Sequence, residues 1–283
     1  MMDRSRYSAL VALTLLVAGC GNVEVDRVEW TAMGTVAAVQ TRGCREGTNA
    51  KALVECAQSV FRDVESRLNA HSPTSEIRRI AALPQAEVLR RCAAADRPCY
   101  EAAFRLAEAS GGAFNPRWRG AGFLDLGAIA KGFAVDLATA AARADGPDAL
   151  VDLGGNLKSL RGSWRTGIKD PGGRGFAAVV ELREGEALAT SATYYRGGHI
   201  FDGRTGKPAS NGVASVTVLC RSAMWADGLS TALFVLGPEE GKAFLASRLL
   251  GLTGGLPVSA LWILDDGRMV RYDPGNRLPE PTH

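Results

Sequence analysis

Apolar and polar positions alternate at the start of the folded part of the chain. Residues 23–30 and 35–40 show the period of two that is typical of strands, with Met33 and Gly34 between them. From Leu53 to Leu68, apolar residues recur three and four positions apart, which is the period of a helix. The pattern predicts a hairpin followed by a long amphipathic helix.

Further along, helix and strand patterns are mixed without regular alternation. Helices are expected at about 100–110, 129–144, 223–236 and from there to 249. Strands are expected at 149–153, 164–168, 177–182 and 214–219, with a terminal hairpin at 259–272 and a frayed tail at 273–283. This mixed order predicts an α+β fold.

The first residues resemble a bacterial lipoprotein signal. Arg4 and Arg6 precede an apolar run from Ala9 to Ala18, which is too short to span a bilayer and ends beside Cys20. We expect a signal peptide over residues 1–19, acylation of Cys20, and a mature domain over 20–283 anchored in the cell envelope and facing the periplasm. Gly21 favours the outer membrane, and an ordinary signal peptide is the alternative.

Composition and charge narrow the function classes. The chain has 283 residues, 46% hydrophobic and 22% charged, as expected of a globular protein. The formal net charge is only +3 and the basic residues are scattered, so binding to nucleic acid is not expected.

Five cysteines follow the expected signal. Cys44, Cys56, Cys92 and Cys99 could form two disulfides in three ways, and no Cys-x-x-Cys spacing suggests zinc. Cys220 ends an alternating strand and is expected to be a buried, inert thiol.

One helical face carries hard oxygen atoms. Asp227, Ser230 and Thr231 lie at positions i, i+3 and i+4, and a carboxylate with two hydroxyls suits Mg²⁺. The alternative is an ordinary polar stripe on an amphipathic helix. Gly228 inside this helix indicates that another group approaches the backbone closely.

Two other features suggest a site that binds a diphosphate and a group that could accept a proton. A strand ending at Asp125 is expected to turn through Gly127 into a helix that carries Lys131, where amides and a cation could bind phosphate. The alternative is a plain turn with a surface lysine. His199 lies among polar, turn-forming residues and is the candidate general base, with a structural histidine as the alternative.

Seven stretches, read in order, resemble the FAD:protein FMN transferase family, also called ApbE. They are the Met-Gly-Thr turn at Met33, GGAFNP at 111–116, LDLGAIAKG at 124–132, VDLGG at 151–155, ALATS at 187–191, HIFDGRTGKP at 199–208 and ADGLSTALFVLG at 226–237. The resemblance implies an α+β fold that binds FAD, with Mg²⁺ at its diphosphate.

The resemblance also implies site residues and a reaction. The metal set is the Ala128 carbonyl with Asp227, Ser230 and Thr231, and the active-site histidine is His199. The flavin-nucleotide positions are Met33, His71, Ala113, Phe114, Asn115, Asp125, Lys131 and Ile200. The implied reaction transfers FMN from FAD to a Thr or Ser hydroxyl of another exported protein and releases AMP. An FAD pyrophosphatase and a non-catalytic FAD-binding lipoprotein are the alternatives.

Four departures from the family pattern indicate a compact variant. Asn115 stands where an aspartate is usual, His71 where a tyrosine is usual, and Gly203 where a proline is usual. Only nine residues separate Asn115 from Asp125, where family members commonly insert several tens.

Overall fold

The computed structural model describes residues 25–43, 50–142, 146–173, 175–193 and 200–280. The predictions for Cys20, Cys44 and His199, and for the signal peptide, lie outside the described residues.

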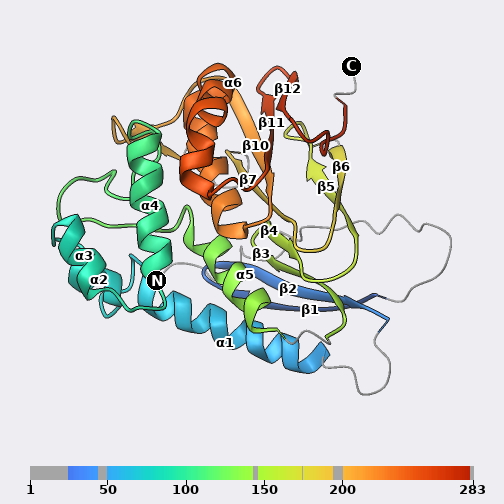
Figure 1. The fold of residues 1–283 in the computed structure, drawn as a ribbon, viewed down its shortest axis with the longest axis horizontal. Helices are drawn as coiled ribbons and strands as arrows, with labels where there is room; N and C mark the ends of the chain where they lie inside the picture. Colours follow the sequence, from blue (N-terminus) through green and yellow to red (C-terminus); the bar gives the residue numbers. More distant parts are fainter. Residues whose placement is uncertain (1–24, 44–49, 143–145, 174, 194–199, 281–283) are drawn as a thin grey trace, which may run out of the picture.

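An eight-stranded antiparallel sheet forms the centre of the fold (Figure 1). Its strands, in spatial order, are β1 (Val25–Ala32), β2 (Thr35–Arg42), β3 (Asp148–Leu153), β4 (Asn156–Ser159), β7 (Ala187–Ala192), β10 (Val213–Cys220), β11 (Val258–Leu264) and β12 (Met269–Tyr272). Strands β4 and β7 pair although they are not consecutive in the chain. The segment between them forms a separate hairpin of β5 (Trp164–Lys169) and β6 (Phe176–Leu182).

Helices cover one face of this sheet, and the β5–β6 hairpin packs on the other (Figure 1). The helices are α1 (Ala50–Leu68), α2 (Glu76–Ile80), α3 (Gln85–Arg91), α4 (Arg97–Ala109), α5 (Ala130–Ala141) and α6 (Ala223–Thr253). A second, shorter hairpin consists of β8 (Phe201–Asp202) and β9 (Lys207–Pro208). The predicted α+β class is confirmed.

Strand β10 shows how period-two alternation builds two cores. Val216, Val218 and Cys220 belong to the helix-side core, whereas Leu219 belongs to the hairpin-side core. Cys220 is 2% exposed, and burial raises the pKa of its thiol. The prediction of a buried, unreactive thiol is confirmed.

Helices α5 and α6 touch at Gly132. A Cβ added to Gly132 would lie 2.1 Å from the Ala223 carbonyl oxygen and 2.8 Å from the Asp227 Cβ, so only glycine fits. Gly228 is likewise approached by Leu106 and Ile129, which would meet an added Cβ at 3.0 and 3.1 Å. The expected close approach at Gly228 is therefore made by core side chains.

Helix α6 consists of two helical segments that meet at a kink, as predicted at 223–236 and from there to 249, although the second ends at Thr253. It runs from Ala223 to Thr253 with a kink at Gly237, whose φ of 72° is left-handed, followed by Pro238. Proline cannot donate to the preceding turn, and the side-chain amide of Asn211 donates to the carbonyls of Phe234 and Val235 at 2.7 and 3.0 Å.

The expectation of a frayed tail is wrong for residues 273–280. The Asp273 carboxylate accepts hydrogen bonds from the backbone N–H groups of Arg277 and Leu278 at 2.9 and 2.7 Å. Arg277 pairs with Glu186 at 2.5 Å, and Leu278 is 4% exposed in the hairpin-side core. The buried Leu278 and the turn capped by Asp273 therefore fix this segment against the hairpin-side core. The composition of the segment did not predict this.

One other local prediction is corrected, and several short elements were not expected. No strand ends at Asp125; Leu124 and Leu126 are both fully buried in an irregular segment, where the Asp125 N–H donates to the Pro116 carbonyl at 2.8 Å. Residues 190 and 191 lie within β7. Helices α2 and α3 and strand β4 were not expected because each is only four to seven residues long.

The cysteine prediction also fails. Each of the three ways of pairing Cys44, Cys56, Cys92 and Cys99 requires one bond among the last three, and all three of these are free thiols. Burial raises the pKa of Cys92, and raises that of Cys99 strongly.

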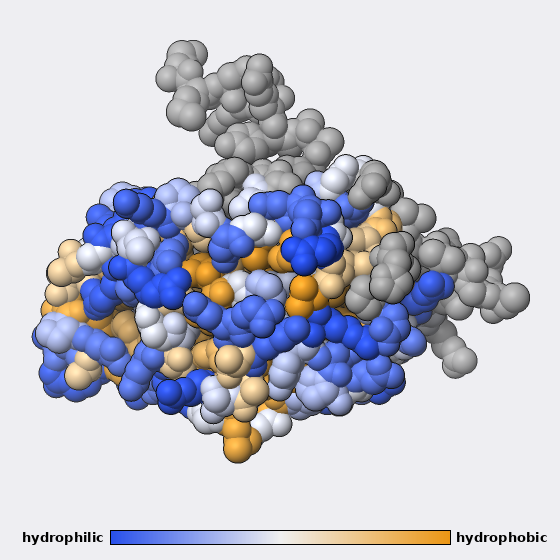
Figure 2. All heavy atoms as spheres, turned by 90° about the horizontal axis from the view of Figure 1, so that it is seen from above, coloured by the Kyte–Doolittle hydropathy of each residue, from blue (hydrophilic) through white to orange (hydrophobic). Residues whose placement is uncertain are grey.

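The surface is largely hydrophilic in the view of Figure 2, with small apolar patches. The large hydrophobic side chains exposed in the described segments are Val28, Val179 and Leu250. In the same part of the chain, no helix is both long and apolar enough to cross a membrane.

Candidate functional site

The carboxylate of Asp227 is the centre of the candidate site. Its side chain is only 7% exposed, and it lies on α6 where α5 approaches most closely. Asp227 Oδ2 accepts a hydrogen bond from the Gly132 N–H at 3.0 Å, and the Lys131 Nζ lies 3.5 Å from Oδ1. Gly132 belongs to the first turn of α5, whose N–H groups lack helical partners, so Asp227 faces the positive end of that helix.

A chain of contacts connects Asp227 to Asp125. The Lys131 ammonium donates to the Gly127 carbonyl at 3.1 Å, and the Gly127 N–H donates to Asp125 Oδ1 at 2.8 Å. The predicted association of Asp125 and Lys131 is therefore present, although an Asx turn rather than a strand end positions Asp125. Ala128 lies inside this same turn, immediately before α5.

Three hydroxyl groups extend the site from Asp227 to strand β7. Ser230 Oγ donates to the Asp227 carbonyl at 2.8 Å and lies 2.8 Å from Ser191 Oγ. Ser191 Oγ is also 3.1 Å from Thr231 Oγ1. Asp227, Ser230 and Thr231 thus share one face as predicted, whereas Ser191 was not among the predicted site residues. The polar run ALATS at the end of an apolar strand was its only signal.

A second aspartate, Asp136 on α5, is not part of this face. Its carboxylate pairs with Lys158 at 2.6 Å and accepts from the hydroxyl of Ser222 at 2.7 Å. It also accepts from the backbone N–H groups of Ala223 and Met224, both at 3.0 Å. Asp136 therefore satisfies the first turn of α6 and fixes that helix against α5.

The turn after α4 contains Ala113, Phe114 and Asn115, which the resemblance assigns to the flavin nucleotide. This turn packs against the β8–β9 hairpin. The Asn115 amide donates to the Gly203 carbonyl at 3.1 Å, and the Gly203 N–H donates to the Ala113 carbonyl at 3.1 Å. A Cβ on Gly203 would lie 2.3 Å from the Asn115 Cβ, so glycine at 203 is required by close contact with Asn115. Phe114 and Ile200 are both buried beside this contact, at 3% and 6% exposed.

Met33 and His71 occupy two further turns. Met33 has a left-handed φ of 49°, and its N–H donates to Glu65 Oε2 of α1 at 2.9 Å. His71 follows α1 in an exposed turn, where its N–H donates to Asn69 Oδ1 at 2.9 Å. No hydrogen bond in the described segments connects either residue to Asp227 or Lys131.

The short connection between Asn115 and Asp125 closes over aromatic rings. Trp118 stacks on Phe201 with ring centroids 4.0 Å apart, and meets Phe123 edge-on at 5.7 Å. The Arg119 guanidinium lies 4.3 Å from the Trp118 ring. This cluster was not predicted, because its members come from two distant segments of the sequence.

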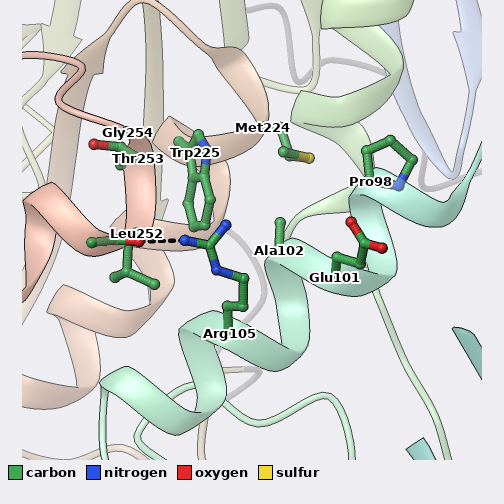
Figure 3. A pocket seen from close by; sticks show the side chains of 10 residues that line it. Pro98, Glu101, Ala102, Arg105, Met224, Trp225, Leu252, Thr253 and Gly254 are labelled. Carbon is green, nitrogen blue, oxygen red and sulfur yellow. Dashed lines mark hydrogen bonds between the residues drawn. The ribbon is translucent and has the colours of Figure 1, made fainter. Parts of the chain in front are cut away.

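Two cavities lie elsewhere in the described residues. One, of about 370 Å³, lies between α4 and the two ends of α6, where the Arg105 guanidinium donates to the Gly251 carbonyl (Figure 3). The other, of about 320 Å³, is lined by Asn115, Pro116 and Arg117 among others. Neither of these two cavities is lined by Asp227. The candidate site is therefore identified by its carboxylate, lysine and hydroxyl groups and not by a cavity.

The donor set fits a hard divalent cation. It offers one carboxylate, two hydroxyl oxygens and the turn that contains Ala128, and Mg²⁺ prefers oxygen ligands. Among the described residues, no group of three or more His, Cys, Asp or Glu side chains could hold a metal. A cation at this face would therefore depend on hydroxyl, carbonyl and ligand oxygens beside Asp227.

Taken together, the described residues form an α+β fold in which a buried carboxylate lies beside a lysine and near three hydroxyl groups. Residues 117–253 match the family model described as the ApbE family. This segment is just under half of the chain.

Curated relatives and solved structures with this family's name also match the chain. The chain is 43% identical over 157 residues to an FAD:protein FMN transferase of Rhodobacter capsulatus, covering 51% of this chain and 28% of the relative. It is 35% identical over 162 residues to one of Vibrio cholerae, covering 51% and 46%. The matched segments thus span less than half the length of these relatives.

The fold is that of solved ApbE structures. The flavin transferase ApbE from Vibrio cholerae superposes with a TM-score of 0.71 at 24% identity, covering 88% of this chain and 97% of that one. The apo form of the Pseudomonas stutzeri flavinyl transferase ApbE gives 0.70 at 24% identity, covering 90% and 96%.

Proposed function

We propose that the protein is an FAD:protein FMN transferase. The observation that carries this proposal is the continuous set of contacts from Asp125 through Lys131 to Asp227, Ser230 and Thr231, within the segment that matches relatives of that name. A cation, a lysine and a helix N-terminus beside one another are the elements that stabilise a diphosphate.

Asp227, Ser230 and Thr231, with the Ala128 carbonyl, would hold Mg²⁺ against the FAD diphosphate. Bound there, Mg²⁺ would supply neutralisation of phosphate charge. Lys131 adds a second positive charge 3.5 Å from Asp227 and would orient the diphosphate. Ala113, Phe114, Asn115 and Ile200 would contact the flavin nucleotide, and the Asn115 amide is held by the Gly203 carbonyl.

The proposed reaction is a phosphoryl-type transfer. The hydroxyl oxygen of an acceptor Thr or Ser forms a bond to the FMN-side phosphorus, and the bond from that phosphorus to the bridging oxygen breaks. AMP leaves with the bridging oxygen, and the hydroxyl proton passes to His199. The product is FMN attached to the acceptor through a phosphodiester.

Purified full-length protein, FAD and Mg²⁺ would test this function with and without a fraction of exported proteins. AMP is followed by chromatography, and covalent flavin by fluorescence in denaturing gels and by mass spectrometry of Thr and Ser peptides. We expect AMP together with covalent flavin. AMP with only free FMN would indicate an FAD pyrophosphatase, and neither product would indicate a non-catalytic protein.

His199 is proposed as the base because a hydroxyl attacks phosphorus poorly until its proton is accepted. His199→Ala should bind FAD with nearly wild-type affinity, measured by flavin fluorescence. Its single-turnover transfer should fall about 100-fold to 10,000-fold. Loss of affinity with normal transfer at saturating FAD would assign His199 to binding instead.

We also propose that the protein is anchored through an acylated Cys20 and faces the periplasm. Support comes from the short apolar run that ends at this cysteine. Cys20→Ser should move the protein out of the membrane fraction. A variant that stays there at the wild-type level would contradict the anchor.

A further inference from the structure

Ser191 lies on β7 with its side chain toward α6, next to the hydroxyls proposed to hold the cation. Its oxygen is 2.8 Å from Ser230 Oγ and 3.1 Å from Thr231 Oγ1. The preceding residue, Thr190, faces the other side of the sheet, where its hydroxyl lies 2.9 Å from that of Thr217. Two adjacent hydroxyls thus point to opposite faces.

Counting protons gives the arrangement in which all three contacts among Asp227, Ser230, Ser191 and Thr231 are hydrogen bonds. A hydroxyl has one proton to donate and two lone pairs that accept. Ser230 donates its proton to the Asp227 carbonyl at 2.8 Å. Ser191 must then donate to Ser230, because Ser230 has no second proton.

The same count fixes the orientation of Thr231. Since Ser191 has given its proton to Ser230, the 3.1 Å contact can only be a hydrogen bond in which Thr231 donates to Ser191. The proton of Thr231 therefore points toward β7. Its lone pairs point away from Ser191 and are available to another group.

We propose that Ser191 is a positioning residue that orients the hydroxyls of Ser230 and Thr231 for a divalent cation. The inference rests on the proposed function. Ser191 accepts the Thr231 proton and donates its own to Ser230, so that neither ligand hydroxyl directs its proton at the cation. Residues that orient metal ligands typically change metal affinity 10-fold to 100-fold when they are removed.

The test is a Mn²⁺ titration of the full-length protein, followed by the paramagnetic resonance signal of free Mn²⁺. Ser191→Ala should weaken Mn²⁺ binding about 10-fold to 100-fold. Ser191→Thr, which retains the hydroxyl, should stay within about 3-fold of wild type. Thr190→Val removes the neighbouring hydroxyl from the opposite face and should leave Mn²⁺ binding unchanged.

Thermal unfolding of each variant separates positioning from folding. If Ser191→Ala does not fold, Ser191→Cys, which keeps nearly the same volume with a weak donor, takes its place and should also bind Mn²⁺ weakly. Loss of binding in Thr190→Val to the same degree would overturn the proposal, because the effect would then be general to β7.

Asp227→Asn distinguishes failure of this inference from failure of the proposed function. If Asp227→Asn loses Mn²⁺ binding while Ser191→Ala binds like wild type, the metal site stands and the role of Ser191 is wrong. If Asp227→Asn also binds like wild type, both the metal site and the role of Ser191 are wrong.

Discussion

Two aspartates near the junction of α5 and α6 differ in how fully they are satisfied. Asp136 has four partners within 3.0 Å: an ammonium, a hydroxyl and two backbone N–H groups. Within the described residues, the Asp227 carboxylate has one hydrogen bond, from the Gly132 N–H, and a lysine at 3.5 Å, although its side chain is the less exposed of the two at 7% against 22%.

A buried carboxylate normally acquires enough partners to offset its lost hydration. Asp136 fulfils that rule and serves the fold. The carboxylate of Asp227 has fewer partners in the described residues, and the hydroxyls of Ser230 and Thr231 lie on the same helical face. This difference is the reason why we propose Asp227, and not Asp136, as the carboxylate that binds a cation.

The largest expected effect is on activity in Asp227→Asn. Asparagine can still accept from the Gly132 N–H, so the free energy of unfolding should change by less than about 1 kcal/mol. Loss of the charge should lower AMP formation from FAD at least about 1000-fold, because metal charge stabilisation contributes several kcal/mol. Turnover assays and thermal melts measure the two effects. A variant with normal activity would contradict the functional role of Asp227.

Asp136→Ala should have the opposite profile. It leaves Lys158 and two N–H groups of α6 without their acceptor, and breaking a largely buried pair costs about 3–4 kcal/mol of unfolding free energy. Urea denaturation measures this loss. The turnover per folded molecule at low temperature should remain within about 3-fold of wild type, and a stable but inactive variant would place Asp136 in the site.

Asp152 on β3 is a third buried aspartate, and its effect on stability should depend on pH. Its carboxylate accepts from the Gly155 N–H at 2.9 Å, and burial raises its pKa from 3.8 to about 6. The folded protein therefore retains a proton that the unfolded chain has lost, so this group lowers the free energy of unfolding as pH rises from about 4 to 6.

Asp152→Asn removes that dependence. Relative to wild type, the variant should gain about 2–3 kcal/mol of unfolding free energy between pH 4 and pH 7, since one pKa unit is worth 1.36 kcal/mol. Denaturation at both pH values measures the difference between the two proteins. A difference that does not change with pH would show that Asp152 titrates normally.

The smallest effect is expected in the C-terminal segment. Arg277→Gln removes the ion pair with Glu186 and should cost about 1 kcal/mol of unfolding free energy. A chain shortened at Asp273 should lose more, because it also exposes the core around Leu278. Equal stability of both variants with wild type would restore the interpretation of this segment as a frayed tail.

The sequence predicted the long elements and the carboxylate–hydroxyl face well. Helix α1 and strand β10 have strong periods, and Asp227, Ser230 and Thr231 needed only helical spacing to be placed together. Local periodicity is sufficient wherever one element carries the whole feature.

Features built from two distant segments were not predictable. Ser191 meets Thr231 across 40 residues, and Asp136 meets Ser222 across 86. The kink at Gly237 depends on Asn211, which supplies the missing hydrogen bonds from another loop. One sequence contains no signal for such pairings, because they follow from how the elements pack.

The most direct test of the central claim is the coupling between FAD and Mg²⁺ at Asp227. FAD binding is titrated by flavin fluorescence with and without Mg²⁺, for wild type, Asp227→Asn and Asp136→Asn. Because two ligands that share a site change each other's affinity by the same factor, we predict that Mg²⁺ tightens FAD binding in wild type and in Asp136→Asn, and has no effect in Asp227→Asn. An equal Mg²⁺ effect in all three proteins would contradict the assignment of Asp227 as the ligand-binding carboxylate.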